Sequence, residues 1–399
     1  MSAARLGVVC DLREEHWHSM DLVADMLLAH LPGVTGGSIA ATRLCPPMVR
    51  RWTRLPLIGR TSSAALADRL IGRLWEYPRW LAPQAGDFDL FHVVDHSYAH
   101  LVRVLPASRT VVSCHDLDAV REALPASRER YRLSALLAGP ILDGLALAAR
   151  VVCLTEATRH ELVANGVCAA DRVSVVPNGV DSTCSPRPDP RADRHVEQLL
   201  GPAPRDAVEI LHVGSTVGRK RIDTLLEVVA RLRKQIPEVR LMRVGGEFTR
   251  AQRAMVGRLG LADRIAVLPF VDRATLAAVY RRASLVLLPS EREGFGLPVV
   301  EAMACGTPVV ASDLPVLREV GGTAVSYCPV GAASRWLECV SELIGEKRTA
   351  PDRWERRRQA AIARAACFSW RAHAAGVAKL YFDILSGAGA PVPSPPGAS

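Results

Sequence analysis

Residues 285–308 of this 399-residue chain read LVLLPSEREGFGLPVVEAMACGTP. The first four residues form an aliphatic run that predicts a buried strand, and a glycine-rich loop follows it. Pro298 is typical of the first turn of a helix, where its missing N–H costs nothing. Gly306 is typical of a helix end, and Pro308 then begins the next strand. The stretch therefore predicts a strand, a glycine loop and a helix whose N-terminal N–H groups favour a bound phosphate.

Two glutamates of this stretch, Glu293 in the loop and Glu301 in the early helix, stand eight positions apart. Carboxylates are unexpected beside a phosphate unless they face neutral hydroxyls, from which they accept hydrogen bonds well. One of them could then hold a hexose and the other a ribose. The alternative is a solvated glutamate beside an ordinary strand–turn–helix. The combination of E-G-F-G-L-P with E-A-M-A-C-G-T-P-V-V favours the binding role.

Short aliphatic runs alternate with helix-length segments over the whole chain, which predicts an α/β protein with parallel sheets and right-handed crossovers. In such sheets ligands collect at the carboxyl ends of the strands. Amphipathic patterns at Asp21–Leu31 and Thr224–Gln235 predict two of the helices. The strands are expected at Leu6–Cys10, Leu90–Val94, Thr110–Cys114, Val151–Leu154, Val173–Val176, Ile210–Val213, Arg240–Val244, Ile265–Leu268, Leu285–Leu288 and Val309–Ala311.

The length of the chain and its apolar fraction of 49% are sufficient for two hydrophobic cores. Prolines cluster among charged residues between Asp181 and Asp206, as is typical of a segment that need not pack, and we place the domain boundary there. A final segment rich in Gly, Ala, Pro and Ser predicts disorder. The expected parts are an N-terminal domain 1–182, a linker 183–206, a C-terminal domain 207–366, a C-terminal helix 367–386 and a disordered tail 387–399.

The composition excludes several classes of protein. The ten cysteines include no C-x-x-C pair, so we expect no zinc or other metal site and reduced thiols in the cytoplasm. We expect no signal peptide, and no apolar run is long enough to cross a bilayer. The net charge of +9 predicts affinity for polyanions. No recognition fold accompanies that charge, so nucleic acid is not an expected partner.

A second glycine turn, at Gly214, follows the expected strand Ile210–Val213 and leads to the cations Arg219, Lys220 and Arg221. Such a turn supplies hydrogen-bond donors and positive charge together, as a diphosphate requires. The alternative is a solvated basic turn, and the pattern favours binding.

Histidines mark two strand ends in the first half of the chain. The strand Thr110–Cys114 runs into His115, and a cleft role is favoured over a structural one there. His92 and His96 flank another strand end, where contact with a substrate and simple packing remain equally open.

Glu293 and Glu301 reproduce the E-x7-E pattern of retaining glycosyltransferases with the GT-B fold, and the block around them resembles glycosyltransferase family 4 (GT4). The H-D-L turn at His115 and the P-N-G-V-D segment from Pro177 are also similar to that family. The resemblance covers most of the chain and is strongest over residues 210–329. It implies a GT-B architecture, in which two Rossmann-like domains present parallel sheets to a central cleft.

The resemblance also implies roles for individual residues, with Glu293, His115 and Lys220 at the centre of catalysis. His115 would face the donor sugar across the cleft. The donor sugar would be held by Glu293, Gly294, Phe295 and Gly296, the nucleoside by Glu301, Phe270 and Val271, and the donor phosphates by Gly214, Arg219, Lys220 and Leu297. Ser215 departs from the family, because many members carry an arginine there. Residues 11–19 lack the family's glycine-rich loop, which leaves the acceptor open.

The expected activity is that of a retaining, metal-independent hexosyltransferase without a cofactor. It would move a hexose such as mannose or glucose from a UDP- or GDP-sugar to a glycan, a lipid-linked or a small-molecule acceptor. The alternatives are a sugar-nucleotide epimerase or a glycoside phosphorylase on the same scaffold, and a non-catalytic sugar-nucleotide-binding protein.

Residues 50–80 combine seven arginines with Trp52, Trp75, Tyr77 and Trp80. That mixture could lie on an anionic membrane or grip a lipid diphosphate acceptor, which would place the protein at the inner face of the plasma membrane. Leu66, Leu70 and Leu74 recur at helical spacing, so a plain amphipathic helix explains part of the pattern. The two interpretations remain open.

Overall fold

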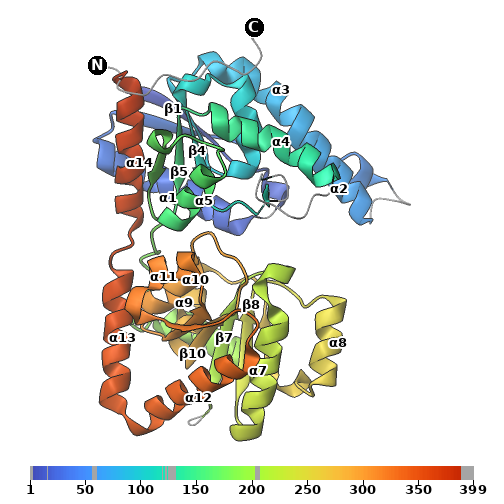
Figure 1. Cartoon of the computed structure of the whole chain (residues 1–399), viewed down its shortest axis with the longest axis vertical. Helices are drawn as coiled ribbons and strands as arrows, with labels where there is room; N and C mark the ends of the chain where they lie inside the picture. The colour runs from blue at the N-terminus through green and yellow to red at the C-terminus, as the bar shows by residue number, and fades with distance from the viewer. Residues whose placement is uncertain are drawn as a thin grey trace. The chain divides into compact units, whose positions relative to one another are not determined.

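The computed structural model of the chain forms two compact units, one built from residues 1–178 and 370–399 and the other from Gly179–Ser369 (Figure 1). Within the part of the chain that the structure describes, no helix is both long and apolar enough to cross a membrane. The described residues are 3–15, 17–55, 61–118, 120–121, 124, 132–202 and 207–387.

The first unit contains a six-stranded sheet in the order β2-β1-β3-β4-β5-β6, with every neighbouring pair parallel. Its strands are β1 (Ala4–Val9), β2 (Ile39–Leu44), β3 (Leu90–Val93), β4 (Thr110–Cys114), β5 (Arg150–Cys153) and β6 (Val173–Val175). Its α-helices are α1 (His18–Thr35), α2 (Ser62–Ile71), α3 (Tyr77–Leu81), α4 (Arg132–Leu147), α5 (Glu156–Ala164) and α14 (Trp370–Leu385).

The second unit repeats this plan with a parallel sheet in the order β12-β11-β10-β7-β8-β9. Its strands are β7 (Glu209–Val213), β8 (Arg240–Val244), β9 (Ile265–Leu268), β10 (Leu285–Leu288), β11 (Val309–Ser312) and β12 (Ser326–Cys328). Its α-helices are α6 (Pro190–Leu200), α7 (Ile222–Gln235), α8 (Arg250–Arg258), α9 (Arg273–Arg282), α10 (Leu297–Ala304), α11 (Pro315–Gly321), α12 (Ala333–Thr349) and α13 (Pro351–Ala365).

The prediction of two parallel α/β sheets is confirmed, and all ten expected strands are present within one or two residues of their expected bounds. The sequence pattern missed β2 and β12, and each of these lies at an edge of its sheet. An edge strand is covered less completely than a central one. β2 therefore carries the exposed Thr42 and the half-buried Arg43, and β12 is only three residues long. Neither has the aliphatic run that marks a buried strand.

Both faces of the first sheet are covered by helices, as side-chain alternation along β3 illustrates. Phe91 and Val93 belong to a core shared with α3 and α4. Leu90, on the opposite face, belongs to a core shared with α1 and α14. Because successive side chains of a strand point to opposite faces, a strand buried on both sides reads as a continuous apolar run.

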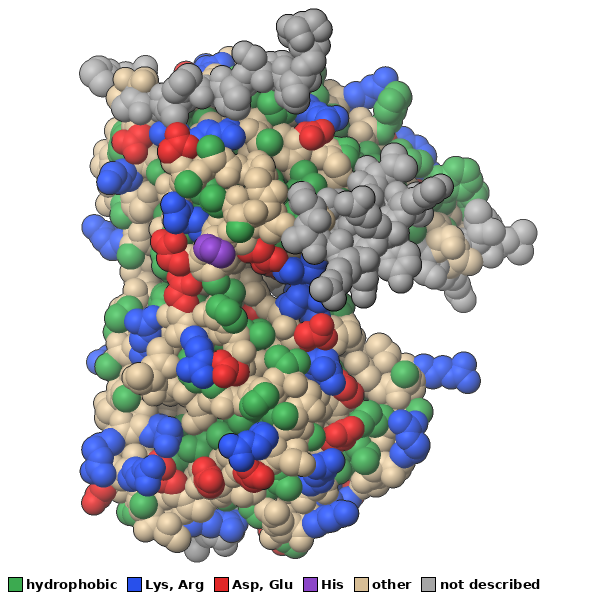
Figure 2. Space-filling model, in the orientation of Figure 1, with side chains coloured by type: hydrophobic (Ala, Val, Ile, Leu, Met, Phe, Trp, Pro, Cys, Tyr) green, Lys and Arg blue, Asp and Glu red, His purple; other side chains and the backbone are tan. Residues whose placement is uncertain are grey.

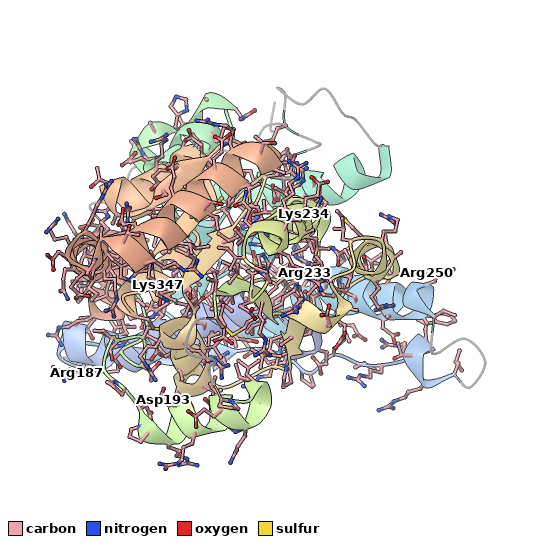
Figure 3. The ribbon with its side chains drawn as sticks, turned by 90° about the horizontal axis from the view of Figure 1, so that it is seen from below. Arg187, Asp193, Arg233, Lys234, Arg250 and Lys347 are labelled. Carbon is pink, nitrogen blue, oxygen red and sulfur yellow. The ribbon has the colours of Figure 1, made fainter. Side chains whose placement is uncertain are left out.

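The segment expected to be a linker, 183–206, instead contains α6 over residues 190–200, and α6 is part of the second unit. Asp189 caps this helix, and Pro190 occupies its first turn. The apolar side chains of Ala192 and Val196 are buried, and Asp193 (labelled in Figure 3) pairs with Arg281 of α9 at 2.7 Å. Prolines therefore mark the start of a packed helix here.

The final helix begins a few residues later than we expected. α14 starts at Trp370, belongs to the first unit and packs beside α1 (Figure 1). Residues 388–399 of the expected tail lie outside the described residues.

A buried histidine joins three elements of the first unit. His92 of β3 places Nδ1 2.5 Å from the hydroxyl of Tyr381 in α14, and its Nε2 lies 2.8 Å from the hydroxyl of Ser113 in β4. Burial lowers the pKa of His92 to about 3, because the low-dielectric core disfavours the imidazolium ion. The unfolded chain would bind a proton at this residue below pH about 6.5, whereas the folded chain would not.

The contribution of His92 to stability is therefore complete above its unfolded pKa and is lost as the pH falls toward its folded pKa. We expect His92→Gln to reduce the dependence of the unfolding free energy on pH by about 1.4 kcal/mol per pH unit in mildly acidic solution. Urea unfolding at a series of pH values measures this slope. His160→Gln, at an exposed position of α5, serves as the control and should leave the slope unchanged. An unaltered slope in His92→Gln would contradict a neutral buried imidazole.

Candidate functional site

Three neighbouring strands of the second unit end at the same edge of the sheet. β7 lies between β10 and β8, and Ile210 of β7 is in register with Leu285 and Leu241. The segments that follow β7 and β10 contain the Gly214 turn and the glutamate loop identified in the sequence, and the segment after β8 adds a glycine turn at Gly245 and Gly246. Parallel pairing therefore brings together, at the carboxyl edge, Lys220 after β7 and Glu293 after β10, which lie 73 residues apart in the chain.

An ion pair joins the loop after β10 to the turn after β7. Lys220 Nζ donates to Glu293 Oε1 at 2.6 Å, and the Glu293 side chain is only 7% exposed. Ser290 Oγ donates to the same carboxylate oxygen at 2.6 Å, and Arg219 lies 3.8 Å from the other oxygen. A backbone bond of 2.7 Å from Glu291 N to Arg219 O holds the two segments in place. The three predicted charged residues Arg219, Lys220 and Glu293 thus form one cluster.

The turns after β7 and β8 pack directly against each other. Gly214 N donates to Val244 O at 2.9 Å. Gly245 has φ +121°, and a Cβ there would lie 2.2 Å from the carbonyl oxygen of Gly214. No larger residue fits without displacing this turn, so glycine is required by both conformation and space.

Arg243 of β8 is a fully buried cation beneath these turns. Its guanidinium donates to the carbonyl oxygens of Gly214, at 2.9 Å, and of Gly246. No carboxylate pairs with it among the described residues. Carbonyl dipoles, the face of the Phe248 ring 5.0 Å away and the charge of Glu247 stabilise the guanidinium. The turns around it form an electropositive base for the site. The sequence reasoning missed Arg243, and the signal that could have revealed it is an arginine inside an otherwise aliphatic strand.

His212 of β7 lies behind Gly214, at a position where a Cβ on Gly214 would come within 3.3 Å of its ring. The ring is completely buried, and neither nitrogen has a hydrogen-bond partner among the described residues. Burial lowers the pKa of His212 to about 3, and the charges of Arg243 and Lys220 act in the same direction. The imidazole is therefore neutral and adds no charge beside the two cations.

The glycine loop after β10 leads directly into α10. Gly296 precedes the helix with φ +87°, and a Cβ there would lie 2.7 Å from Leu317 Cδ2. Phe295 is buried, and its ring packs edge-to-face on Phe368 with the centroids 5.7 Å apart. Of the predicted sugar-binding residues, Phe295 can therefore offer its backbone but not its side chain. Leu297 is the first residue of α10, where backbone N–H groups have no intrahelical acceptor.

Glu301 lies one turn into α10 and is held by α9. Tyr280 donates its hydroxyl proton to Glu301 Oε2 at 2.7 Å. Burial raises the pKa of Glu301, and the Tyr280 hydrogen bond opposes that rise. Arg273 and Asp181, themselves paired at 2.8 Å, also act on this carboxyl group. The sequence reasoning identified Glu301 but not Tyr280 or Arg273, because α9 approaches it only in the folded unit.

Phe270 and Val271, the other predicted nucleoside residues, follow β9 at the end of the sheet beyond β8. The Phe270 side chain is 68% exposed, and Asp272 directly after it caps α9. They therefore lie next to the helix that carries Tyr280 and Arg273. The exposed ring of Phe270 is therefore close in the chain to α9, the helix whose Tyr280 holds Glu301.

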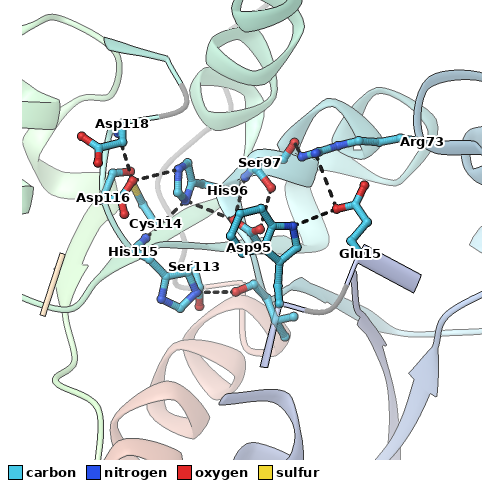
Figure 4. Close-up of polar contacts among 12 residues, drawn as sticks. Glu15, Arg73, Asp95, His96, Ser97, Ser113, Cys114, His115, Asp116 and Asp118 are labelled. Carbon is cyan, nitrogen blue, oxygen red and sulfur yellow. Dashed lines mark hydrogen bonds and ion pairs between the residues drawn. The ribbon is translucent and has the colours of Figure 1, made fainter. Parts of the chain in front are cut away.

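His115 lies in the first unit, at the carboxyl end of β4 (Figure 4). Its Nε2 donates to Val94 O at 2.6 Å, and its backbone N–H donates to His96 Nδ1 at 3.4 Å. Burial lowers the pKa of His115, which keeps the imidazole neutral. Asp95 and Asp116 flank His96 at 3.3 and 3.7 Å. The two predicted histidine positions, 96 and 115, are thus adjacent at one edge of the sheet.

The segment after β1, which lacks the expected glycines, adds acidic side chains to the first unit. Both carboxyl oxygens of Asp11 are buried without a hydrogen-bond partner among the described residues. Burial and the nearby Asp95 carboxylate raise the pKa of Asp11 well above its usual range, which favours its protonated form. Glu15 is also buried, with Arg69 and Arg73 at 3.5 and 3.8 Å (Figure 4). The sequence showed only that this segment departs from the family.

The contact between the two glycine turns leads to a paired prediction. We expect Gly245→Ala to destabilise the second unit by at least about 1–3 kcal/mol, because the new methyl group meets the Gly214 carbonyl in an unfavourable backbone region. Gly257→Ala is the control, since Gly257 lies within α8 with open space around it and alanine is the better helix former. Denaturant unfolding compares the two variants. Equal stability of both would rule out a tight contact.

Two family models match the chain. The model described as "Glycosyl transferases group 1" matches residues 201–359, and that described as "Glycosyltransferase Family 4" matches residues 36–183. A D-inositol 3-phosphate glycosyltransferase from Frankia alni is 31% identical over 321 residues, which are 76% of this chain and 76% of that protein. One from Segniliparus rotundus is 36% identical over 249 residues, 60% of this chain. The chain spans about half the length of that relative, 53%.

Solved structures resemble the whole chain in fold. Sucrose-phosphate synthase from Thermosynechococcus elongatus matches with a TM-score of 0.72 at 20% identity, over 96% of this chain and 100% of that one. HepE from Anabaena, solved in complex with UDP and glucose, matches with a TM-score of 0.69 at 18% identity and the same coverage. At these identities the likeness concerns the fold alone. The family models and the Frankia alni relative, together with the paired parallel sheets and the E-x7-E loop, show that the chain belongs to glycosyltransferase family 4, the group 1 glycosyl transferases.

Proposed function

We propose that this protein is a retaining glycosyltransferase that takes a hexose from a nucleoside-diphosphate sugar bound to its second unit. The observation that carries the proposal is the cluster of Glu293, Lys220 and Arg219 at the carboxyl edge of β10 and β7. A buried carboxylate beside two cations and a glycine loop offers partners for both a sugar hydroxyl and a phosphate.

The diphosphate would bind against Arg219, Lys220 and the amides around Gly214 and Leu297. Lys220 is paired with Glu293, so its side chain is held in a fixed direction within the site. A phosphate oxygen can share its ammonium group, because that group has three donors. The buried charge of Arg243 and the start of α10 add to the positive potential, which would favour an anion at this place.

The hexose hydroxyls would bind Glu293 and the backbone of residues 294–296, and the ribose hydroxyls would bind Glu301. Tyr280 orients the Glu301 carboxylate and leaves its other oxygen available to a ligand. Phe270 and Val271 would border the base. In the first unit, the neutral imidazole of His115 would contact the transferred sugar, and the polar groups around His96 would serve the acceptor.

In the reaction the bond between the anomeric carbon and the phosphate oxygen breaks, and the departing diphosphate gains negative charge. Arg219, Lys220 and the N–H groups of the loop and α10 would stabilise that charge, a role that requires no divalent metal. The acceptor hydroxyl would attack from the same face of the sugar and lose its proton to the leaving phosphate. The configuration of the anomeric carbon would then be retained.

Similar proteins narrow the expected substrates. HepE from Anabaena was solved with UDP and glucose, which supports a UDP-sugar as the first donor to test, followed by GDP-sugars. The relatives named D-inositol 3-phosphate glycosyltransferases support a small hydroxylated acceptor over a long glycan. Incubation with the donor alone, and then with inorganic phosphate, distinguishes a transferase from an epimerase or a phosphorylase.

The phosphate assignment is tested with Lys220→Ala. We expect turnover to fall at least about 100-fold, the usual effect of removing a donor that stabilises developing charge. Lys234→Ala is the matched control, because Lys234 is an exposed lysine of the adjacent α7 (Figure 3). Release of the nucleoside diphosphate from a UDP-sugar measures both variants. Turnover close to wild type in Lys220→Ala would exclude this lysine from the site.

The ribose assignment is tested with Glu301→Ala. We expect weaker binding of UDP and of uridine alike, because the lost carboxylate contacts the part that both ligands share. Lys220→Ala should instead weaken UDP and leave uridine unchanged. Calorimetric titration with the two ligands measures the difference, and Glu238→Ala, at an exposed position, provides the control. Unchanged uridine affinity in Glu301→Ala would overturn the ribose role.

A further inference from the structure

Exposed apolar side chains gather in one short segment of the first unit. Of the thirteen large hydrophobic residues that are exposed among the described residues, seven lie between positions 49 and 80. This segment is less than a tenth of the chain, so such a concentration is unlike the scattered exposure of ordinary surfaces. The seven residues, which we call the apolar patch, are Val49, Trp52, Leu55, Leu66, Leu74, Trp75 and Trp80.

A continuous helical run displays most of the patch. α2 is followed by a π-helical turn, η3 (Gly72–Glu76), and then by α3. The inner face of the run carries Ala64, Asp68 and Gly72 at a spacing of four, and Tyr77 continues that face after the π-turn. The Tyr77 hydroxyl fixes the run to the strands by contacts of 2.7 and 2.8 Å with the carbonyl oxygens of Cys10 and Leu44. The outer face is consequently held away from the core.

The turn that carries Trp52 is fixed to this run by a buried carboxylate. Asp68 of α2 is completely buried and accepts hydrogen bonds from the backbone N–H groups of Arg51, Trp52 and Thr53 at 2.9–3.0 Å. It also accepts one from the Thr53 hydroxyl at 2.7 Å. A carboxylate that receives four donors holds the 3-10 turn η2 (Trp52–Arg54) firmly. Trp52 is thus presented to solvent by a rigid support.

Cations surround the patch, and its two carboxylates do not offset them at the surface. Asp68 is used internally, and Glu76 pairs with Arg51. The side chains of Arg50, Arg54 and Arg79 are exposed. The guanidinium of Arg79 lies 3.4 Å from the centroid of the Trp75 ring and forms a cation–π contact with it. A positive charge is therefore directly adjacent to an exposed apolar side chain. In Figure 2, hydrophobic and Lys or Arg side chains intermingle where Figure 1 draws α2 and α3.

An occupant of this surface must accept tryptophan and leucine side chains and supply dense negative charge around them. A bilayer that contains anionic phospholipid does both, because indole rings settle at the headgroup level and guanidinium groups pair with lipid phosphates. A charged polymer such as nucleic acid has no apolar interior in which the side chains of Leu66 and Leu74 could be buried. An acidic protein would have to match charge and apolar area over a mixed surface.

We propose that the apolar patch and its arginines dock the protein on the surface of an anionic phospholipid bilayer. The side chains of Trp52, Trp75 and Trp80 enter the headgroup region, and Arg50, Arg54 and Arg79 bind phosphate groups. The helical run lies along the surface and does not cross it. This docking is independent of which sugar or acceptor the second unit serves.

Sedimentation of the full-length protein with vesicles tests the proposal. We expect binding to vesicles of equal parts phosphatidylglycerol and phosphatidylcholine, and at least about tenfold weaker binding to pure phosphatidylcholine or in high salt. Trp75→Ser combined with Trp52→Ser should reduce binding to the anionic vesicles by a similar factor. Phe382→Ser is the matched control, since Phe382 on α14 is as exposed as Trp52, at 42%, and lies outside the patch. It should bind like wild type.

Additional variants, and a test for self-association, define the results that would overturn the proposal. Arg50→Glu combined with Arg54→Glu should abolish the preference for anionic lipid. Equal binding to neutral and anionic vesicles, or full binding by the tryptophan double variant, would overturn the proposal. Self-association that disappears with the tryptophan substitutions, without vesicle binding, would assign the patch to a second copy of this chain and also overturn it. Thermal unfolding followed by circular dichroism confirms that each variant folds, and UDP affinity measured in every variant keeps this result separate from the donor site.

Discussion

The buried ion pair between Lys220 and Glu293 is the interaction on which the candidate site depends. It joins a turn after β7 to a loop after β10, and each partner satisfies a charge that would be costly to bury alone. Ser290 and Arg219 complete the carboxylate's contacts. The pair fixes the directions of the two side chains that are expected to meet sugar and phosphate. A preorganised pair of this kind lowers the reorganisation that binding and charge stabilisation would otherwise require.

The glycine turns under this pair depend on a second constraint, the fully buried Arg243. Its guanidinium ties the carbonyl oxygens of Gly214 and Gly246, while Gly245 leaves no room for a side chain against Gly214. Buried His212 is neutral, so it adds no third charge beside Arg243 and Lys220. Buried positive charge, a helix start and tightly packed glycines therefore act together at one sheet edge. The first unit uses a different chemistry at its own edge, where Asp11, Asp95 and two histidines are buried together.

Much of the fold was predictable because its central strands are buried on both faces. Leu285–Leu288 is a continuous apolar run, and Thr110–Cys114 is fully buried around a central Val111–Val112 pair. The bounds of both strands agree with the expectation. The edge strands β2 and β12 escaped notice because half-exposed strands carry no such run. The prolines around residue 190 suggested a linker, whereas Asp189, Ala192 and Val196 form a capped and packed helix. Prolines and charged residues in a sequence indicate where one helix or strand ends. They do not indicate whether the following residues form another helix that packs on the core.

The sequence by itself determined the family and pointed to the leading residues of the candidate site. Glu293, Glu301 and Lys220 stand in short local patterns of glycine, proline and charge whose spacing is set by the strand–loop–helix geometry. Tertiary structure alone decided the surroundings of these residues. Tyr280 reaches Glu301 from α9, and Arg243 and His212 lie beneath the glycine turns on β8 and β7. The same holds for the docking surface, since only the folded unit shows that Asp68 and Tyr77 face inward and leave Trp52 and Trp75 outside. Contacts between residues far apart in the chain leave no periodic trace in the sequence, so only the folded chain reveals them.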